Sequence, residues 1–512
     1  MPLHGGAQVP FKRTHRVLFD TKSEGVQHTN QLFGVGVAGP RGWPKRLIGF
    51  FKTARFQQVA PALNVGKGGR GQQGQAISKQ KGRAHRWILL MGLCLCGGAQ
   101  ASEVAFHPFD PDKAALGRLL FYDPILSGNR NISCGTCHHH DHFSADGISL
   151  SIGEGGEGLG PKRRATMGAN RPKKRIPRHA PALWNIGARE FTHFFHDGRV
   201  SRSDLFENGF NTPAEEWLPP GLSGLLAVQA LFPMTAQFEM AGNPKENEVA
   251  GAIHDRLDNA WPILAKRVRI IPEYGAAFVD AFEEVERAED VTIAHIANAL
   301  ADFMGSEWRS LDSPYDAYLT GTPLPADAER GRQLFFGAAN CASCHSGPLF
   351  TDHGFHAIGV PPFGPGRTRR FDPMVRDVGR MAESNQLEDA YRFRTPSLRN
   401  VALTAPYGHN GAYPTLEGIV RHHLDPVGRL SSWEPRLANL PDAPWLSAID
   451  FVIWQDAREM ARLRAAIDIV PVDLSEADIA DLVAFLHSLT GGSSRHGRLG
   501  RPDRVPSGLR VD

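Results

Sequence analysis

The sequence has few cysteines, six in 512 residues. This scarcity excludes a small fold held together by many disulfides, and the length indicates two to three domains with cores of their own. An excess of one charge is also missing, because 57 Lys and Arg residues stand against 54 Asp and Glu residues. The balance gives no global electrostatic drive toward nucleic acid or an anionic membrane. Alternating runs typical of strands are missing too, so we expect a mainly α fold.

The apolar stretch from Trp87 to Cys96 is too short to span a bilayer. Two arginines precede it, and an A-x-A cleavage pattern that ends at Ala101 follows it. Residues 83–101 therefore predict a secretion signal, which places the mature chain in the periplasm. A buried helix is the alternative. A lipoprotein signal is less well supported, because a leucine and not a small residue precedes each cysteine of this stretch.

Residues 1–82 come before this signal, although a signal belongs at the start of a chain. They are rich in Gly, Gln, Lys and Arg and show little apolar periodicity. We expect this extension to be disordered or not translated at all, with the true start just upstream of Arg83. A nucleic-acid-binding tail is the other interpretation of the basic residues, but export argues against it.

Four of the six cysteines form two identical spacings, C-G-T-C-H at 134–138 and C-A-S-C-H at 341–345. A zinc site, a redox dithiol and a covalently held haem are the chemistries to separate. Structural zinc usually takes four ligands, and His139, His140 and His142 could help only at the first motif. A redox dithiol does not require a histidine directly after both cysteine pairs.

Covalent haem accounts for both motifs. Two thioether bonds fix the porphyrin, and the adjacent histidine reaches the iron. Such haems are attached after export, so the predicted signal is independent support. We therefore predict two haem c groups, held by Cys134, Cys137 and His138 at the first motif and by Cys341, Cys344 and His345 at the second.

Helical patterns surround both motifs. Apolar residues recur at helical spacing in three stretches, namely 112–121, 292–308 and 475–491. A short helix is also expected before the second motif, and the repeated helix–motif order indicates an internal duplication. We expect one domain at 102–315 and another at 316–491. Residues 492–512 have no apolar stripe and are expected to be a disordered tail.

With these motifs in place, the sequence resembles the bacterial di-haem cytochrome c peroxidases and their MauG-type relatives. Matching phrases run through about 110–490 in the family's order, among them "LGRLLFYDPILSGNRNISCGTCH", "FFHDGRV", "QALFPMTAQFEM" and "FRTPSLRNVALTAPYGHNGAYPTLEGIVRHH". The resemblance implies two cytochrome-c-like haem domains and hydrogen peroxide as a substrate. It also implies an electron donor in the periplasm, a small cytochrome or a cupredoxin, and is compatible with a homodimer.

The resemblance makes the first haem the peroxide-reactive one. Glu239 matches the family's distal carboxylate and Gln229 its distal glutamine, and Pro233 between them also matches. A carboxylate at this place can move a proton between the two oxygens of a peroxide. Without the resemblance, Glu239 would be interpreted as a surface helix cap.

At the first haem the chain departs from many family peroxidases directly after "SIG". Those proteins have a histidine there that closes the iron at rest, whereas this chain has Glu154. The difference indicates an iron that is open without reductive activation, as in the MauG-type branch. The longer loop that follows contains Met167, a less favoured candidate for a haem ligand.

At the second haem, the count from "LTAPY" places His423 where the family has Met or Tyr as the distal ligand. The local pattern agrees, because His423 shares one helical face with Leu416, Ile419 and Val420, and His422 does not. A satisfied core histidine is the alternative, and it is usually the better one for a lone histidine. We expect His423 to be the distal ligand.

Two further positions match the family only in part. The "FWDGR" tryptophan, which relays electrons between the family's haems, is His196 here, and Trp184 is a substitute route. The family also binds calcium through an Asn side chain and backbone carbonyls. Thr404 and Pro406 match the carbonyl positions, but His179 replaces the Asn, and imidazole is a poor ligand for a hard cation. Calcium is therefore doubtful.

Three functions stay open from the sequence. The leading one is a periplasmic di-haem peroxidase that reduces hydrogen peroxide to water at the first haem, with electrons entering through the second. The next is MauG-type chemistry, in which peroxide-derived oxidising equivalents act on a protein or small-molecule substrate. The third is a di-haem electron carrier without catalysis, against which Glu239 and Gln229 argue. An insertion at 431–455 fits no family pattern and is a candidate cover for a haem edge or a partner site.

Overall fold

The computed structural model describes residues 103–367 and 375–512, which belong to one compact unit, Cys94–Asp512. The predicted extension at 1–82 and the predicted signal at 83–101 lie outside the described residues. Among the helices of the described ranges, none is both long and apolar enough to cross a membrane.

Helices of the first half begin at clear start signals. The Asp110 side chain accepts hydrogen bonds from the N–H groups of Asp112 and Lys113, and Pro111 occupies the first helical position. The helices of this half are α1 Pro111–Tyr122, α2 Leu225–Ala230, α3 Glu248–Ala252, α4 Trp261–Arg269, α5 Pro272–Ala281 and α6 Ile293–Glu307.

The second half also begins with a capped helix. Ser313 and Asp316 form a capping box, in which each side chain binds the backbone of the other. The helices of this half are α7 Pro314–Leu319, α8 Ala326–Phe336, α9 Met381–Ser384, α10 Leu416–Leu424, α11 Pro426–Ser432, α12 Pro444–Ser447, α13 Ala457–Ala466 and α14 Glu476–His487.

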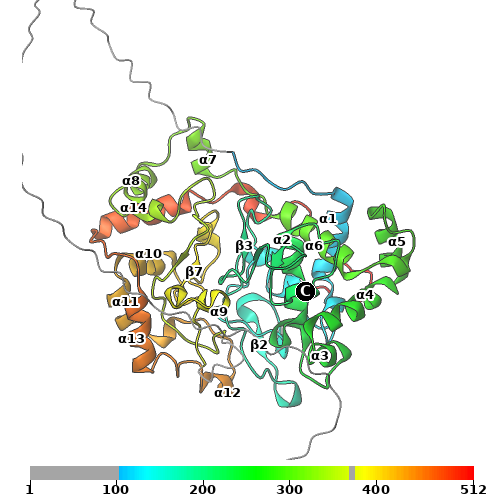
Figure 1. The fold of residues 1–512 in the computed structure, drawn as a ribbon. Helices are drawn as coiled ribbons and strands as arrows, with labels where there is room; N and C mark the ends of the chain where they lie inside the picture. Colours follow the sequence, from blue (N-terminus) through cyan, green and yellow to red (C-terminus); the bar gives the residue numbers. More distant parts are fainter. Residues whose placement is uncertain (1–102, 368–374) are drawn as a thin grey trace, which may run out of the picture. The chain divides into compact units, whose positions relative to one another are not determined.

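The two halves repeat one close crossing of helices. A Cβ atom on Gly117 of α1 would lie 1.9 Å from the carbonyl oxygen of Ala299 in α6. A Cβ atom on Gly331 of α8 would lie 1.8 Å from the carbonyl oxygen of Asp481 in α14. Only glycine allows backbones to approach this closely. The repeated crossing supports the internal duplication, and both α1 and α8 precede a C-x-x-C-H motif in the chain (Figure 1).

The strands are short and antiparallel. They form three small sheets, β1 with β2, β3 with β4 and β5, and β6 with β7. Their bounds are β1 Gly156–Glu157, β2 Arg164–Ala165, β3 His193–Phe194, β4 Val200–Arg202, β5 Phe210–Asn211, β6 Phe355–His356 and β7 Phe393–Arg394. The prediction of a mainly α fold is confirmed, because helices carry most of the regular structure in the described ranges.

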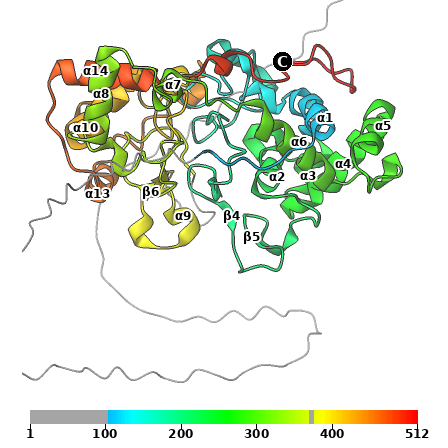
Figure 2. The same ribbon diagram turned by 90° about the horizontal axis from the view of Figure 1, so that it is seen from above.

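Two hydrophobic cores lie on opposite sides of the described unit (Figures 1 and 2). The first draws almost all of its residues from 104–308 and includes the contacting rings of Phe121 in α1 and Phe303 in α6. The second draws almost all of its residues from 324–489 and includes the rings of α8 and α14. The cores therefore fall on either side of the predicted domain boundary.

The tail at residues 492–512 differs from the prediction of disorder. It is ordered and packs on the first half, where Val505 is buried among residues of the first core. The N–H groups of Leu499 and Gly500 both donate to the Glu307 carboxylate at 2.8 Å. The prediction was wrong because a tail that packs on an existing core needs only scattered apolar residues, not a helical stripe of its own.

The tail ends at the first C-x-x-C-H motif. The hydroxyl groups of Ser133 and Thr136 donate to the Asp512 carboxylate, with a distance of 3.2 Å for Ser133. Leu509 and Val511 lie against the first core beside this contact. The first motif is therefore covered by residues that come more than three hundred positions later in the chain.

The insertion at 431–455 packs against the first half. The Arg175 guanidinium donates to both carboxylate oxygens of Asp450, at 3.0 and 2.9 Å, and both side chains are buried. The indole N–H of Trp445 in α12 donates to the carbonyl of Pro172 at 2.8 Å. The insertion thus braces a loop of the first half from the side of the second.

Candidate haem-binding active site

Each C-x-x-C-H motif begins with one short 3-10 turn, which is followed by the second cysteine and then by the histidine. The turns are Cys134–Thr136 and Cys341–Ser343, and all four motif cysteines are free thiols. Burial raises the pKa of the Cys134, Cys137 and Cys341 thiols to about 12. A reactive dithiol needs a lowered thiol pKa, so these surroundings argue against the redox alternative.

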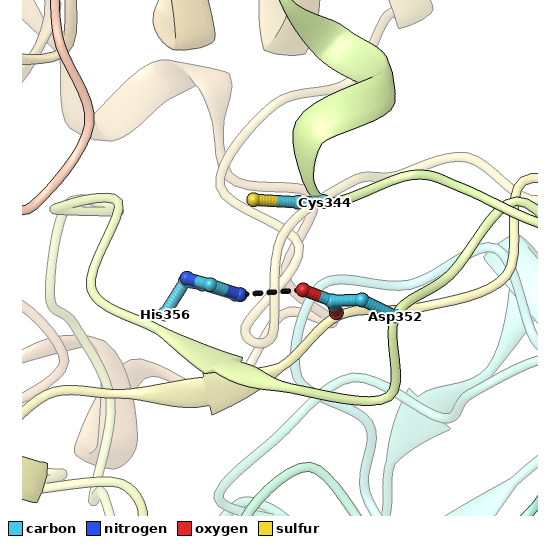
Figure 3. A group of neighbouring side chains, drawn as sticks. All are labelled: Cys344, Asp352 and His356. Carbon is cyan, nitrogen blue, oxygen red and sulfur yellow. Dashed lines mark hydrogen bonds and ion pairs between the residues drawn. The ribbon is translucent and has the colours of Figure 1, made fainter. Parts of the chain in front are cut away.

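A complete zinc site is not formed at either motif within the described ranges. The ligand-type side chains that converge there are Cys344, Asp352 and His356, where the imidazole Nε2 lies 2.9 Å from the carboxylate (Figure 3). At the first motif, His140 instead binds the buried Glu307 carboxylate at 2.8 Å. Three ligands, one of them a predicted thioether cysteine, do not complete the tetrahedral shell of structural zinc.

Both motif histidines are oriented by a hydrogen bond from one ring nitrogen. Nδ1 of His138 lies 3.1 Å from the Ser144 carbonyl, and Nδ1 of His345 lies 3.1 Å from the Phe350 carbonyl. A carbonyl only accepts, so Nδ1–H donates and Nε2 is left as the ligand atom, which is the usual arrangement of metal-binding histidine. Burial lowers the pKa of both, that of His345 to about 4, and thereby favours the neutral form that binds metal.

A second imidazole stands opposite His345. The ring centroids of His345 and His423 are 6.3 Å apart, and His423 also directs Nδ1 to a carbonyl, that of Ile419, at 2.9 Å. His422 differs, because its Nδ1 binds the Tyr413 hydroxyl and its Nε2 the Ile358 carbonyl, both at 2.8 Å. His422 is therefore a satisfied core histidine, while His423 keeps Nε2 for a ligand.

The spacing of His345 and His423 suits one iron between them. Metal–imidazole bonds are about 2.0 Å long, and a ring nitrogen lies about 1.1 Å from its centroid, so two imidazoles on one metal have centroids about 6.2 Å apart. The observed 6.3 Å agrees with this value. Among the described residues, no imidazole stands opposite His138 in the same way. The donor sets therefore fit two haem groups, one with imidazole on both sides and one with imidazole on a single side.

Glu239 lies in a π-helical turn, Gln237–Ala241, and is half-buried. Its carboxylate has no hydrogen-bond partner within residues 103–367 and 375–512. Burial raises the pKa of Glu239, and the positive charges of Arg199 and Arg367 partly offset this by lowering it. Its negative charge also contributes to the raised pKa of the Cys137 thiol of the first motif. Gln229, half-buried on α2, precedes it by ten positions.

A buried carboxylate holds the arginines that act on Glu239. Asp197 forms an ion pair with Arg178 at 2.7 Å and accepts hydrogen bonds from Arg199 and Arg367 at 3.2 Å each. Burial alone would raise the pKa of Asp197, but the three guanidinium groups hold it well below its ordinary value. Since Arg367 comes from the second half, both halves contribute charge next to Glu239.

Glu154 is held in place through one of its two carboxylate oxygens. Oε2 accepts from the amides of Asn129 and Asn131 at 3.1 and 3.2 Å, and the backbone N–H of Glu154 donates to the Phe238 carbonyl at 3.1 Å. Oε1 is buried and has no hydrogen-bond partner within the described residues. Met167 is 74% exposed and therefore does not close the first site.

The two candidate relay residues lie at different places. His196 donates Nε2–H to the His179 carbonyl at 3.1 Å, and its own carbonyl accepts from Arg394 of the second half at 2.8 Å. Burial and the charge of Arg178 lower the pKa of His196 to about 3, so its ring is neutral. Trp184 is buried, and its indole nitrogen has no hydrogen-bond partner within the described ranges.

The candidate calcium position contains a proton donor. His179 is buried and directs Nδ1–H to the Ile148 carbonyl at 2.7 Å. Thr404 is half-buried and Pro406 is buried, and their carbonyl oxygens accept no backbone hydrogen bond within the described residues. A donating imidazole supplies no oxygen to a hard cation, so the arrangement gives calcium no added support.

Sequence reasoning missed the groups that surround the candidate site. Asp197 and Arg199 lie within the phrase "FFHDGRV", but only the fold shows that a buried carboxylate collects three arginines there. Tyr122, His140 and Glu307 form a second hydrogen-bonded group next to the first motif. No spacing in the sequence indicates either group, because their members come from distant elements.

Comparisons with known proteins find di-haem peroxidases and MauG proteins among the relatives of this chain. The model of the family described as di-haem cytochrome c peroxidase matches residues 111–323, which include the first motif. The methylamine utilization protein MauG of Methylorubrum extorquens is 28% identical over 387 residues, which cover 75% of this chain and 79% of that protein. The cytochrome c551 peroxidase of Pseudomonas aeruginosa is 28% identical over 327 residues, covering 63% of this chain and 74% of that protein.

The solved structures that resemble this chain include a MauG-like protein and a diheme peroxidase. A MauG-like protein associated with microbial copper homeostasis matches with a TM-score of 0.51 and 26% identity, over 80% of this chain and 97% of that one. The diheme peroxidase BthA from Burkholderia thailandensis matches with a TM-score of 0.50 and 25% identity, over 80% of this chain and 91% of that one.

Proposed function

We propose that this chain is a di-haem peroxidase of the periplasm that reduces hydrogen peroxide to water, and its similarity to cytochrome c peroxidases and MauG proteins supports the proposal. Peroxide reacts at the first motif. Electrons from a small cytochrome or a cupredoxin enter at the second. The observation that carries the proposal is the asymmetry of the sites, since His345 faces His423 across 6.3 Å, whereas the first motif has Glu239 nearby with a free carboxylate.

The motif residues hold the cofactors. Cys134 and Cys137 would attach the first haem c and His138 would ligate its iron, while Cys341 and Cys344 would attach the second. His345 and His423 would ligate the iron of that second haem. When bound, haem supplies the electrons and the open coordination position that peroxide reduction requires. We place one haem in each of two cytochrome-c-like domains, 102–315 and 316–491.

Glu239 is the proton carrier of the reaction. Its carboxylate takes the proton of one peroxide oxygen and gives it to the other, so that this second oxygen can leave as water, and the electrons that break the O–O bond would come from the haem groups. Burial places its pKa closer to neutrality than that of an ordinary carboxylate, and the nearby guanidinium groups of Arg199 and Arg367 keep the ionised form accessible. Gln229 orients peroxide beside it through its side-chain amide.

His196 and Trp184 are the relay candidates between the haems. His196 lies where the halves meet, but a neutral imidazole is harder to oxidise than an indole. Trp184 is buried, and its neighbour Leu183 donates a backbone hydrogen bond to Ser144, the residue whose carbonyl orients His138. Calcium has no part in the proposal, and a homodimer stays a prediction.

A steady-state assay with hydrogen peroxide and a reduced small cytochrome tests the proposal. We expect peroxide-dependent oxidation of the cytochrome, together with a mass gain of two haem groups in the mature chain. A mature chain that carries one haem or none would refute the two-haem assignment. A protein with no turnover and no spectral response to peroxide would be an electron carrier.

MauG-type oxidation of a protein or small-molecule substrate is the second candidate function. Glu154 favours it, because Asn129 and Asn131 hold this residue in place where many family peroxidases have a closing histidine. A first site that is open at rest needs no reductive activation. Peroxide-induced spectral change without turnover of any reduced cytochrome would favour this candidate over the first.

A further inference from the structure

A strongly basic loop follows Glu154 in the first half. Residues 158–178 contain eight Lys and Arg residues and no Asp or Glu, although the whole chain is nearly neutral. In Figure 1 the loop is the cyan segment around β2, near α12 of the insertion. None of the functions proposed above uses these charges, so the loop requires its own explanation.

Three of the eight cations are structural and face inward. Arg163 is buried and donates to the carbonyls of Ile152, Gly153 and Gly158. Arg175 is paired with Asp450, and Arg178 is paired with carboxylates of both halves; both arginines are buried as well. Buried guanidinium groups with several acceptors fix the backbone of the loop.

The other five cations face solvent or line the surface. Lys162, Arg164, Arg171 and Lys173 are exposed, and Lys174 is half-buried. The acidic groups close to them are few. Glu157 lies 3.6 Å from Arg164, and Glu246 feels the charge of Lys173. Both of these carboxylates are exposed and screened by solvent, so the face keeps a net positive charge.

The charged face is held in place by the insertion. Arg171 stacks over the ring of Trp445 with 5.5 Å to the centroid, and the Trp445 indole binds the Pro172 carbonyl at 2.8 Å. Because the loop is braced at both this point and Asp450, its charges are presented in one arrangement. A braced surface loses little conformational entropy when a partner binds.

The face also lies directly above the candidate peroxide site. The Lys174 ammonium lies over the Phe238 ring, 5.7 Å from its centroid. Phe238 precedes Glu239 in the same π-helical turn, and its carbonyl accepts the N–H of Glu154. One aromatic side chain therefore separates this surface from the turn that carries the proposed proton carrier.

We propose that the exposed face of residues 158–174 is a docking surface for an acidic protein that binds over the first site. The proposal deepens the proposed function by naming the chemistry of a partner, and it rests on that function only for the identity of the site beneath. Long-range attraction steers such a partner and raises its association rate. An anionic membrane is the less suitable occupant, because interfacial binding relies on exposed aromatic and aliphatic residues. The exposed large apolar side chain on this face is that of Met167, and Trp445 is half-covered.

Binding measurements on the haem-loaded protein test the proposal without peroxide. The probes are mitochondrial cytochrome c, which is basic, and its succinylated form, which has the same fold and an acidic surface. We expect the succinylated form to bind, with an affinity that falls steeply as salt is raised, and the basic form not to bind. The triple variant Lys162→Glu, Arg164→Glu, Lys173→Glu should lower the association rate about tenfold or more with little change in dissociation.

A matched triple variant separates a local surface from overall charge. Lys266→Glu, Arg495→Glu and Arg504→Glu reverse three exposed cations outside the loop. Equal losses in both triple variants, or binding of the basic form alone, would overturn the proposal. Loop-dependent binding to phosphatidylglycerol vesicles without binding of the succinylated form would assign the face to a membrane instead. A peroxidase assay that fails leaves these binding results unchanged, so the two proposals are tested separately.

Discussion

Hydrogen bonds of the imidazole rings separate, residue by residue, histidines that keep a free ring nitrogen from those that do not. His138, His345 and His423 are half-buried, and each directs Nδ1–H to a backbone carbonyl and keeps Nε2 for a ligand. His422 is fully buried and uses both ring nitrogens. Neighbouring histidines on one helix therefore have different chemistry because they contact different backbone atoms.

The first prediction concerns this pair of neighbours. His423→Ala should convert the low-spin signal of the second ferric haem to high-spin, because an axial imidazole is lost. His422→Ala should leave that signal low-spin but lower the free energy of unfolding by about 1–3 kcal/mol, because the Tyr413 hydroxyl and the Ile358 carbonyl lose their partner. Electron paramagnetic resonance and denaturant titration give the two readouts. If His422→Ala makes the second haem high-spin, then His422 and not His423 is the ligand, and the assignment made here is wrong.

The second prediction concerns Glu239. Glu239→Gln should keep both haems and slow the reaction with peroxide by roughly a hundredfold or more, because the amide cannot carry the proton. Burial raises the pKa of this carboxylate, so in the unmodified protein the rate should rise with pH through a value above the ordinary 4.5. That acid limb should vanish in the variant. Stopped-flow mixing with peroxide across pH measures both effects, and an unchanged rate would make Glu239 structural.

Single residues also show how far sequence reasoning reaches. The helical face of His423 follows from spacing alone, because a helix of nine residues keeps its period. Glu239 could be singled out only through family resemblance, since one glutamate in a short turn has no periodic signal. The arginines around Asp197 could not be foreseen, because they lie at 178, 199 and 367 and meet only in the folded chain.

Among the elements, helices with a periodic apolar pattern could be predicted from the sequence. The contacts by which the insertion holds a loop of the first half could not. The stretch expected at 112–121 is α1, Pro111–Tyr122, because a capping aspartate, a proline and an apolar stripe all agree there. The insertion has no such agreement of signals. Its place depends on the pairing of Arg175 with Asp450, which are separated by 275 positions.

The third prediction tests this brace. Asp450→Ala should lower the free energy of unfolding by about 3–5 kcal/mol, because it leaves the buried Arg175 charge without its partner. Hydrogen exchange should speed up in residues 158–178, which the pair holds. Arg458→Ala, at an exposed position of α13, is the control and should change stability by less than about 0.5 kcal/mol. Unaltered exchange in the loop would show that Trp445 alone fixes it.

The whole described unit is two cores joined by segments that cross between them. The insertion of the second half holds a loop of the first, and the tail that follows α14 packs on the first core. Expecting that tail to be disordered was reasonable from composition, because local sequence contains no information on a core built by residues 104–308. The error shows that a polar tail can be ordered by a surface formed elsewhere.

The fourth prediction is made for the unit as a whole. Deleting residues 498–512 removes buried Val505 and the two N–H groups that donate to the buried Glu307 carboxylate. The free energy of unfolding should fall by about 3 kcal/mol or more, since each lost partner of a buried charge costs about 1–3 kcal/mol. The spectrum of the second haem should not change. Arg504→Ala, within the tail but exposed, is the matched control. If the deletion variant unfolds at the same denaturant midpoint as the full chain, the tail does not stabilise the first half.

The contact of Asp512 with the first motif also bears on access to the first cysteine pair. The hydroxyl groups of Ser133 and Thr136 donate to the Asp512 carboxylate, so the folded tail lies over this motif. An enzyme that attaches haem to Cys134 and Cys137 would have to act before the tail docks, or displace it. The second motif has exposed residues at Asn340 and Ser343, which leave that motif approachable in the folded unit. The order of folding and haem attachment would therefore matter more at the first site than at the second.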